Sequence, residues 1–348
     1  MDGRRLFDAY VAVDWSARDS PSPRRPSRDS VWFAHRAVDR EITATVYART
    51  REECFGQLRN LLVAHAENGQ RVFVGFDFPF GFPSGFAAAL GLEPAGAHAA
   101  WRHIWDELSL LIADHPDNHN NRFDAAASLN RRCGGERPGP LWGYPAGAAR
   151  PGLTAKSPRF PYAAGQGSRL ERLRWTERRQ PGTQPVWKLF GAGSVGSQCL
   201  MGIPYVRRLR FDPELGTVSR VWPFETGFAD AWGHGTPDAG ARTGGPGRAR
   251  TEGPGRARTE GPGRARTSPP PPQGEPFILY AEIWPSMAPG RDPAAPIRDE
   301  DQVRAMVTWL RSLDDRGWMD GLLRTPPALP AHALHDVLAE EGWIAGTR

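Results

Sequence analysis

The chain of 348 residues lacks the features of several protein classes. No stretch approaches the roughly 18 consecutive apolar residues of a membrane span, and MDGRRLFDAY is not followed by an apolar signal region. We therefore expect a cytoplasmic protein with no membrane contact. The three cysteines, Cys54, Cys133 and Cys199, are far apart and form no CxxC pair, which argues against a disulfide framework and favours reduced thiols.

A basic excess is also missing from most of the chain, although the isoelectric point is about 9.4. Between Arg242 and Thr267 the sequence repeats GPGRART three times, with seven Arg and two Glu. Removing these from the totals of 44 basic and 39 acidic residues leaves 37 of each sign. We expect residues 235–275 to be a disordered Gly/Pro/Arg insertion, because few apolar side chains are present to offset ordering entropy. It is either a solvated linker or a basic tether that binds phosphate backbones nonspecifically.

The first 80 residues predict three strands, a helix and a fourth strand. AYVAVDW is the first strand, and SVWFAHRAV and EITATVYAR form a hairpin. Thr50, with Glu53 three residues later, predicts the cap of a helix that ends at Gly69. RVFVGFDF then predicts a strand parallel to the first and buried on both faces.

The pattern is weaker in the rest of the chain. We expect a loop at Arg18 to Ser30 and a helical and loop insertion at residues 84–185, in which AAWRHIWDELSLLIADH is the clear helix. VSRVWPFETGF and FILYAEIWPSM predict strands on either side of the repeat, and DEDQVRAMVTWLRSLDDRGW predicts an amphipathic helix. The chain is therefore expected to be a single α/β domain over residues 1–348.

Three of the predicted strands carry one acid near their C-terminal ends: VAVDW with Asp14, VGFDF with Asp77 and LYAEIW with Glu282. Ligands of open α/β sheets bind at the carboxyl ends of the strands, so these side chains can converge. Converging carboxylates repel one another unless a cation is present, and oxygen ligands favour Mg²⁺ or Mn²⁺. Asp299, at the start of the C-terminal amphipathic helix, is a candidate fourth ligand, and Asp301 could serve equally well.

Structural roles stay open for the same acids. Asp14 and Asp77 could cap the turns that follow their strands, and Asp299 could simply begin its helix. Between residues 122 and 179 there are 12 basic and 4 acidic residues, which form either a solvated rim or an electropositive wall for a phosphate-bearing substrate. Arg131, Arg132 and Lys188 are the candidate phosphate contacts.

Several segments together resemble the predicted nucleases with an RNase H-like fold that are catalogued as domain of unknown function 429. They are VAVDWSA, VGFDFPFGFP, NRRC, KLFGAGSVGSQCLMGIP, VWPFETG, AEIWPS and the DEDQV helix. The resemblance implies a mixed sheet flanked by helices, in which the first three strands are antiparallel and the later ones parallel, and a metal-binding acid cluster. It implies that Asp14, Asp77, Glu282 and Asp299 are catalytic and metal-binding. In such a site two ions would clamp a phosphodiester of a nucleic acid or a small phosphate compound.

Other functions compete with the nuclease. GAGSVG at residues 191–196 matches the dinucleotide fingerprint, but a Gly-rich turn that opens a helix and holds a phosphate explains it as well. An RNase H-like fold can also belong to an ATP-dependent phosphotransferase, although Trp15 and Ser16 replace the Gly-rich turn expected after Asp14. A catalytically inactive binding module is the remaining alternative. HPDNH at residues 115–119 could imitate a metal site but is explained by a loop.

Overall fold

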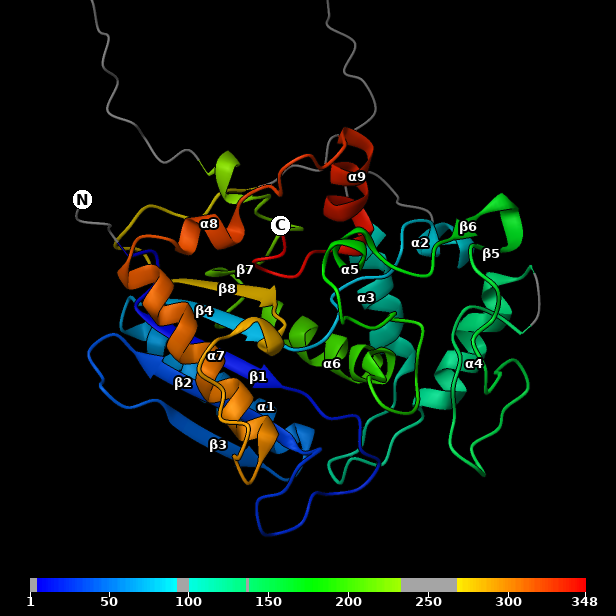
Figure 1. The fold of residues 1–348 in the computed structure, drawn as a ribbon, viewed down its shortest axis with the longest axis horizontal. Helices are drawn as coiled ribbons and strands as arrows, with labels where there is room; N and C mark the ends of the chain where they lie inside the picture. The colour runs from blue at the N-terminus through cyan, green and yellow to red at the C-terminus, as the bar shows by residue number, and fades with distance from the viewer. Residues whose placement is uncertain (1–4, 93–99, 136–137, 233–267) are drawn as a thin grey trace, which may run out of the picture.

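The computed structural model describes residues 5–92, 100–135, 138–232 and 268–348 (Figure 1). Its strands are β1 (Ala9–Asp14), β2 (Val31–Ala37), β3 (Ala44–Ala48), β4 (Arg71–Phe76), β5 (Tyr162–Ala163), β6 (Arg169–Leu170), β7 (Ser219–Val221) and β8 (Phe277–Glu282). Its α-helices are α1 (Arg51–Glu67), α2 (Phe86–Ala89), α3 (Ala100–Leu111), α4 (Arg122–Cys133), α5 (Trp175–Arg179), α6 (Val195–Arg210), α7 (Arg298–Asp315), α8 (Met319–Leu323) and α9 (Ala331–Asp336). A single π-helical turn, Val337–Glu341, follows α9.

The main sheet has six strands in the order β3-β2-β1-β4-β8-β7. β1 and β3 each pair antiparallel with β2, whereas β4 pairs parallel with β1 and β8, and β7 pairs parallel with β8. This confirms the expected RNase H-like arrangement, with the first three strands antiparallel and the later ones parallel. The strands β5 and β6 form a separate two-stranded sheet.

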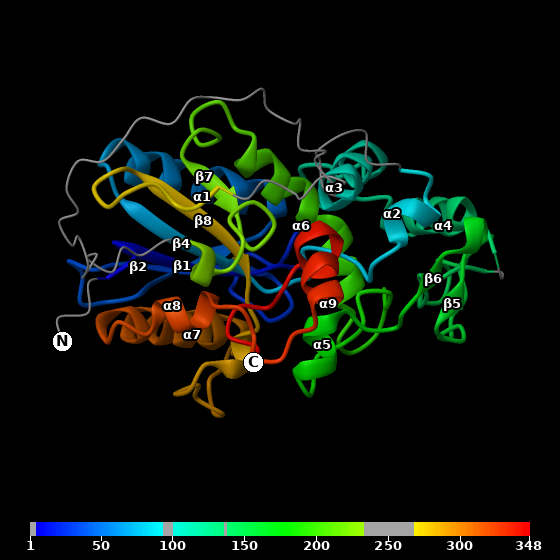
Figure 2. The same cartoon turned by 90° about the horizontal axis from the view of Figure 1, so that it is seen from above.

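Helices cover both faces of the main sheet. Figure 2 shows α7 and α8 on one side of the sheet and α1 and α6 on the other. β1, β4 and β8 are buried along their whole length, as expected for central strands covered on both faces. Their side chains alternate between two cores: Val13 packs on the α1 side and Tyr10 on the α7 side.

Elements with a strong periodic pattern form where they were expected. The Thr50 side chain accepts a hydrogen bond from the Glu53 backbone N–H at 3.2 Å and caps α1. The expected insertion at residues 84–185 contains α2 to α5 and the small sheet, of which only α3 was anticipated. The helix α4 was not predicted, because its buried face includes the small residues Ala125, Ala126 and Ala127, which give a weak apolar signal.

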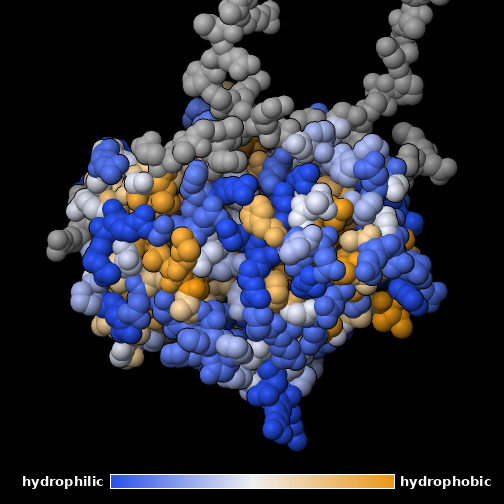
Figure 3. All heavy atoms as spheres, turned by 180° about the vertical axis from the view of Figure 1, so that it is seen from behind, coloured by the Kyte–Doolittle hydropathy of each residue, from blue (hydrophilic) through white to orange (hydrophobic). Residues whose placement is uncertain are grey.

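Three further expectations concern the repeat, membrane-spanning helices and the cysteines. The repeat lies outside the described residues up to residue 267, and residues 268–275 form no helix or strand. No helix in the described ranges is long and apolar enough to span a membrane. Figure 3, the face opposite to that of Figure 1, shows mainly hydrophilic residues with small separate apolar patches. All three cysteines are buried and free, as expected.

Candidate functional site

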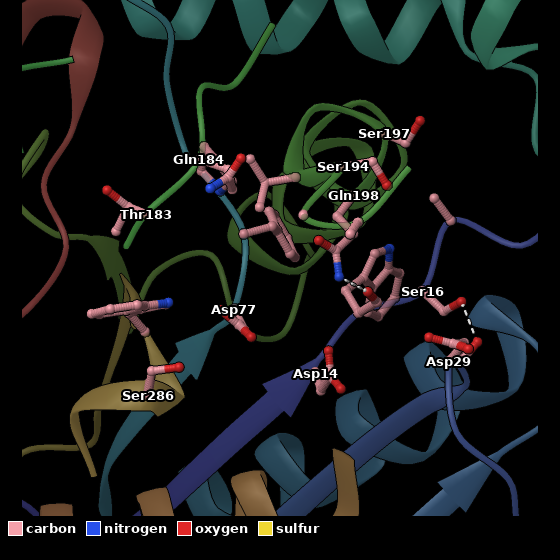
Figure 4. Close-up of a pocket in the computed structure, with 18 of the residues that line it drawn as sticks. Asp14, Ser16, Asp29, Asp77, Thr183, Gln184, Ser194, Ser197, Gln198 and Ser286 are labelled. Atoms are coloured by element: carbon pink, nitrogen blue, oxygen red, sulfur yellow. Dashed lines mark hydrogen bonds between the residues drawn. The ribbon is translucent and has the colours of Figure 1, made fainter. Parts of the chain in front are cut away.

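A cavity of about 780 Å³ lies at the carboxyl ends of β1, β4 and β8. Asp14, Asp77, Glu282 and Asp299 all line it, so the four acids singled out in the sequence reach one cavity. Figure 4 shows Asp14 and Asp77 at the ends of two neighbouring strands. The four acids differ, however, in what surrounds them.

Asp14 and Asp77 lie side by side on the same face of the sheet. Val13 pairs with Phe76 in the parallel ladder, and the Asp77 backbone N–H donates to the Val13 carbonyl at 2.9 Å. The ladder therefore continues by one residue and brings Asp77 next to Asp14, and residues in register share a face. Asp14 is only 9% exposed. No residue in the described ranges donates a hydrogen bond to either carboxylate.

The carboxyl groups of this pair have strongly perturbed pKa values. Burial, together with the charges of Asp77 and Asp299, raises the pKa of Asp14 well above its ordinary value. Burial, together with Glu282 and Asp299, raises the pKa of Asp77 from 3.8 to about 7. Ionising both carboxyl groups in this position costs free energy unless a cation lies between them. The pair therefore favours binding of a positively charged ligand.

Asp299 approaches the pair from the first turn of α7. Its Oδ2 accepts a hydrogen bond from the backbone N–H of Asp29 at 2.6 Å, and burial raises its pKa. Asp29 has a left-handed φ of 56° and also lines the cavity, although the sequence analysis treated its segment only as a loop. Asp301 does not line the cavity, because its carboxylate accepts from the Asp292 N–H at 2.7 Å and pairs with Arg304.

Glu282 is held by an arginine that the sequence analysis did not single out. The guanidinium of Arg174 donates to both carboxylate oxygens, from Nη1 to Oε2 at 2.8 Å and from Nη2 to Oε1 at 2.6 Å. Arg174 is fully buried and also donates from Nε to Glu177 at 2.8 Å. The backbone N–H of Phe80 donates to Oε2 at 3.1 Å. Both oxygens of Glu282 are therefore already engaged.

The strand register explains why Glu282 differs. It pairs with Phe76, one residue before Asp77, so its side chain lies on the opposite face of the sheet from that of Asp77. Within the described part of the chain, no three His, Cys, Asp or Glu side chains are arranged to hold a metal ion. The four acids line one cavity, but the carboxylate of Glu282 is paired with Arg174 and does not join the other three in a metal-binding cluster.

A smaller metal site still fits the residues present. Mg²⁺ is commonly bound by one or two carboxylates, with waters and substrate phosphate oxygens as the other ligands. Asp14 and Asp77 supply such a pair of oxygen donors without competing hydrogen bonds, and Asp299 lies on the same cavity. The donor type and the electrostatics therefore suit a single hard cation.

The Gly-rich turn at residues 191–194 forms the wall across the cavity from the acids. It leads directly into α6, and Figure 4 shows Ser194 and Gln198 across from Asp14. No hydrogen bond within the described structure uses the backbone N–H groups of residues 191–194. Unpaired amides at the start of a helix are suited to an anion such as phosphate.

Close backbone packing holds this turn in place. Gly193 has a φ of +70°, and a Cβ on Gly196 would lie 2.7 Å from the Lys188 carbonyl oxygen and nearer still to that of Val186. The Gly196 N–H donates to the same Lys188 carbonyl at 3.0 Å. The Lys188 Nζ donates to the Ala192 carbonyl. Lys188 therefore supports the turn from behind.

The other two candidate phosphate contacts lie on α4 and do not line the cavity. Arg131 donates to the Pro151 carbonyl at 3.2 Å, and Arg132 pairs with Glu107. The described structure instead places Arg18 and Arg122 at the cavity, each with a buried Nε that has no hydrogen-bond partner among the described residues. Nothing in the sequence distinguished these two arginines from the other basic residues.

The dinucleotide reading of GAGSVG lacks its structural context. No strand of the described structure leads into the turn, because Lys188 forms only an isolated bridge with Trp142. A βαβ unit with the turn at its first connection is therefore absent from the described ranges. The alternative of a Gly-rich turn that opens a helix matches α6. HPDNH forms a loop between α3 and α4, with Asn118 at a φ of 71°.

Comparisons of this chain with protein-family models, with curated proteins and with solved structures find no match. The nuclease resemblance therefore rests on the motifs quoted above. The cavity itself brings two unpaired carboxylates opposite a turn of unpaired amides.

Proposed function

We propose that this chain is a divalent-metal-dependent phosphodiesterase of the nuclease type, with Asp14 and Asp77 as the protein ligands of Mg²⁺ or Mn²⁺. The observation that supports it most is the pairing of two opposite walls in one cavity. One wall presents two carboxylates without hydrogen-bond donors, the buried Asp14 and the half-buried Asp77, and the other presents the unpaired amides at the start of α6. A phosphate ester bound with a divalent cation complements both walls at once.

Different residues of the cavity bind the cation and the phosphate in this proposal. When bound, a divalent cation supplies activation of the attacking water and stabilisation of the leaving oxygen. Asp14 and Asp77 hold the cation side, and the amides of residues 191–194 donate to the phosphate oxygens on the other side. Arg18 and Arg122 add positive charge at the same cavity.

Glu282 and Arg174 have a positioning role in this proposal. Their ion pair is buried, and Glu282 also accepts from the Phe80 N–H, three residues after Asp77. Arg174 donates to the Glu341 carbonyl at 2.8 Å, which ties the C-terminal segment to the same network. The pair therefore holds the chain that leaves β4 after Asp77.

Metal binding and cleavage test the proposal together. Calorimetry with Mn²⁺ should show binding to the wild type and its loss in the double variant Asp14→Asn/Asp77→Asn. Labelled single-stranded DNA and RNA should be cleaved by the wild type with Mn²⁺ and left intact by the double variant. Asp124→Asn removes an exposed carboxylate of α4 that pairs with Arg150, and serves as the matched control. Equal Mn²⁺ binding by the double variant and the wild type contradicts the proposal.

An ATP-dependent phosphotransferase is the second candidate, and the Gly-rich turn favours it. The turn and the acids would then hold the phosphates of a nucleotide and its cation. Incubation with ATP and small hydroxyl compounds separates the two functions. Transfer of phosphate to a hydroxyl compound, without cleavage of any phosphodiester, would replace the nuclease by this candidate.

A further inference from the structure

Phe190 and Trp284 bring aromatic surface to the cavity. Ile42, Leu110, Phe190 and Trp318 are the exposed large apolar side chains of the described structure. Among these four, Phe190 is the one that lines this cavity, and it is 47% exposed. Trp284 is half-buried and also lines the cavity. Neither ring is sealed in the core as Trp15 is, so both offer surface to a ligand.

The aromatic residues continue the wall that carries the unpaired amides. Phe190 immediately precedes the Gly-rich turn. A Cβ on Gly182 would lie 3.3 Å from the Trp284 ring, and a Cβ on Gly193 would lie 2.6 Å from Cγ of Gln184. The segment 182–184 is therefore in close contact with Trp284 at one end and with the turn at the other. Aromatic surface and anion-binding amides thus belong to one continuous wall.

The depth of the cavity limits what can reach the acids. Asp14 is 9% exposed and Trp15, beside it, is 1% exposed, so the carboxylate lies below the molecular surface. The volume of about 780 Å³ falls in the range of roughly 300–1,000 Å³ that is usual for small-molecule sites. A double helix is too wide for such a cavity, whereas one nucleotide unit fits.

We propose that the cavity binds a single-stranded nucleotide unit, with its phosphate between the acids and the Gly-rich turn and its base against Phe190 and Trp284. This rests on the proposed function, which places the phosphate. The base supplies a flat apolar face that stacks on aromatic side chains whatever its sequence. The unit comes either from a free short nucleotide or from a single strand, and the chemistry recognised is the same.

Binding of fluorescein-labelled pentanucleotides, measured by fluorescence anisotropy with Ca²⁺ as the cation, tests the stacking directly. The wild type should bind a single-stranded pentanucleotide more tightly than its abasic counterpart or the duplex of the same sequence. Phe190→Ala should weaken single-strand binding by about 5-fold to about 150-fold, the range that loss of one base–aromatic stack produces. Phe190→Tyr should keep the affinity. Leu110→Ala, which removes an exposed apolar side chain outside the cavity, should leave it unchanged.

The outcomes separate this inference from the proposed function. Equal binding of the abasic strand or of the duplex, or unchanged binding by Phe190→Ala, overturns the inference. If an unlabelled dinucleotide competes as strongly as the unlabelled pentanucleotide, the nucleotide unit comes from free short nucleotides. If the dinucleotide competes more weakly, the unit comes from a single strand. Mn²⁺-dependent hydrolysis of bis(p-nitrophenyl) phosphate without base-dependent binding overturns only the inference. Base-dependent binding without hydrolysis of any phosphodiester overturns only the proposed function.

Discussion

Replacing Asp77 by Asn is expected to make the metal-free protein more stable at neutral and alkaline pH. Burial and the neighbouring carboxylates Glu282 and Asp299 raise the pKa of Asp77 from 3.8 to about 7. One pKa unit corresponds to about 1.4 kcal/mol, so ionisation of Asp77 lowers the free energy of unfolding by about 4 kcal/mol. Asn has nearly the same shape and no charge. Because some solvent reaches Asp77, we expect the free energy of unfolding to rise by about 2–4 kcal/mol at about pH 8.

The sign of this effect sets its pH dependence. The folded-state pKa of Asp77 lies above the unfolded value, so the folded protein binds the proton more tightly. Ionisation of Asp77 therefore lowers the free energy of unfolding of the wild type as the pH rises from about 4 to about 7, and the Asn variant lacks this contribution. The difference between the two proteins should fall by more than half between about pH 8 and about pH 5.

Urea unfolding at both pH values, in EDTA and in Mn²⁺, measures these differences. At a Mn²⁺ concentration of about 100 times the dissociation constant, the wild type should gain about 2.7 kcal/mol, and Asp77→Asn should gain far less. Asp124→Asn, at an exposed ion pair, should change the free energy of unfolding by less than about 1 kcal/mol. A less stable Asp77→Asn protein in EDTA at about pH 8, or an equal gain with Mn²⁺, would refute the reasoning.

Three further substitutions test other parts of the structure. Arg174→Met leaves Glu282 buried without its cation, so the free energy of unfolding measured in urea should fall by about 3–5 kcal/mol. A fall of less than about 1 kcal/mol contradicts this expectation. Gly196→Ala places a methyl group against the Lys188 carbonyl and should reduce cleavage at least tenfold in kcat/KM; unchanged kcat/KM argues against a role of the turn. Asp314→Leu removes the acceptor of the Leu6 and Phe7 N–H groups and the Tyr10 hydroxyl, and calorimetric melting should show a Tm lower by several degrees.

Regular elements were predictable where periodicity or a cap was strong. The apolar runs of β1, β4 and β8 and the Thr50 cap of α1 were recognisable from the sequence, and the family resemblance implied that the first three strands are antiparallel. The helix α4 was missed because alanines build much of its buried face. The small sheet of β5 and β6 has two-residue strands, which are too short to show an alternating pattern.

The site was predictable only in part. A carboxylate inside an apolar run is unusual enough to mark Asp14 and Asp77, and both line the cavity. Arg174 pairs with Glu282 across 108 positions, and Arg18 and Arg122 come from two separate segments. No local pattern marks such long-range contacts, because they depend on how the insertions pack on the sheet.

The sequence by itself determined that acids stand at the ends of three buried strands, since burial of the flanking residues follows from the apolar runs. Only the tertiary structure decided which of these acids face each other. Side chains alternate along a strand, so a shift of one residue in register moves a carboxylate to the opposite face. Asp77 continues the ladder beside Asp14, whereas Glu282 pairs with Phe76 one residue earlier and meets Arg174 instead. A difference of one residue in pairing, which depends on contacts along the whole sheet, thus separates an unpaired acid from a neutralised one.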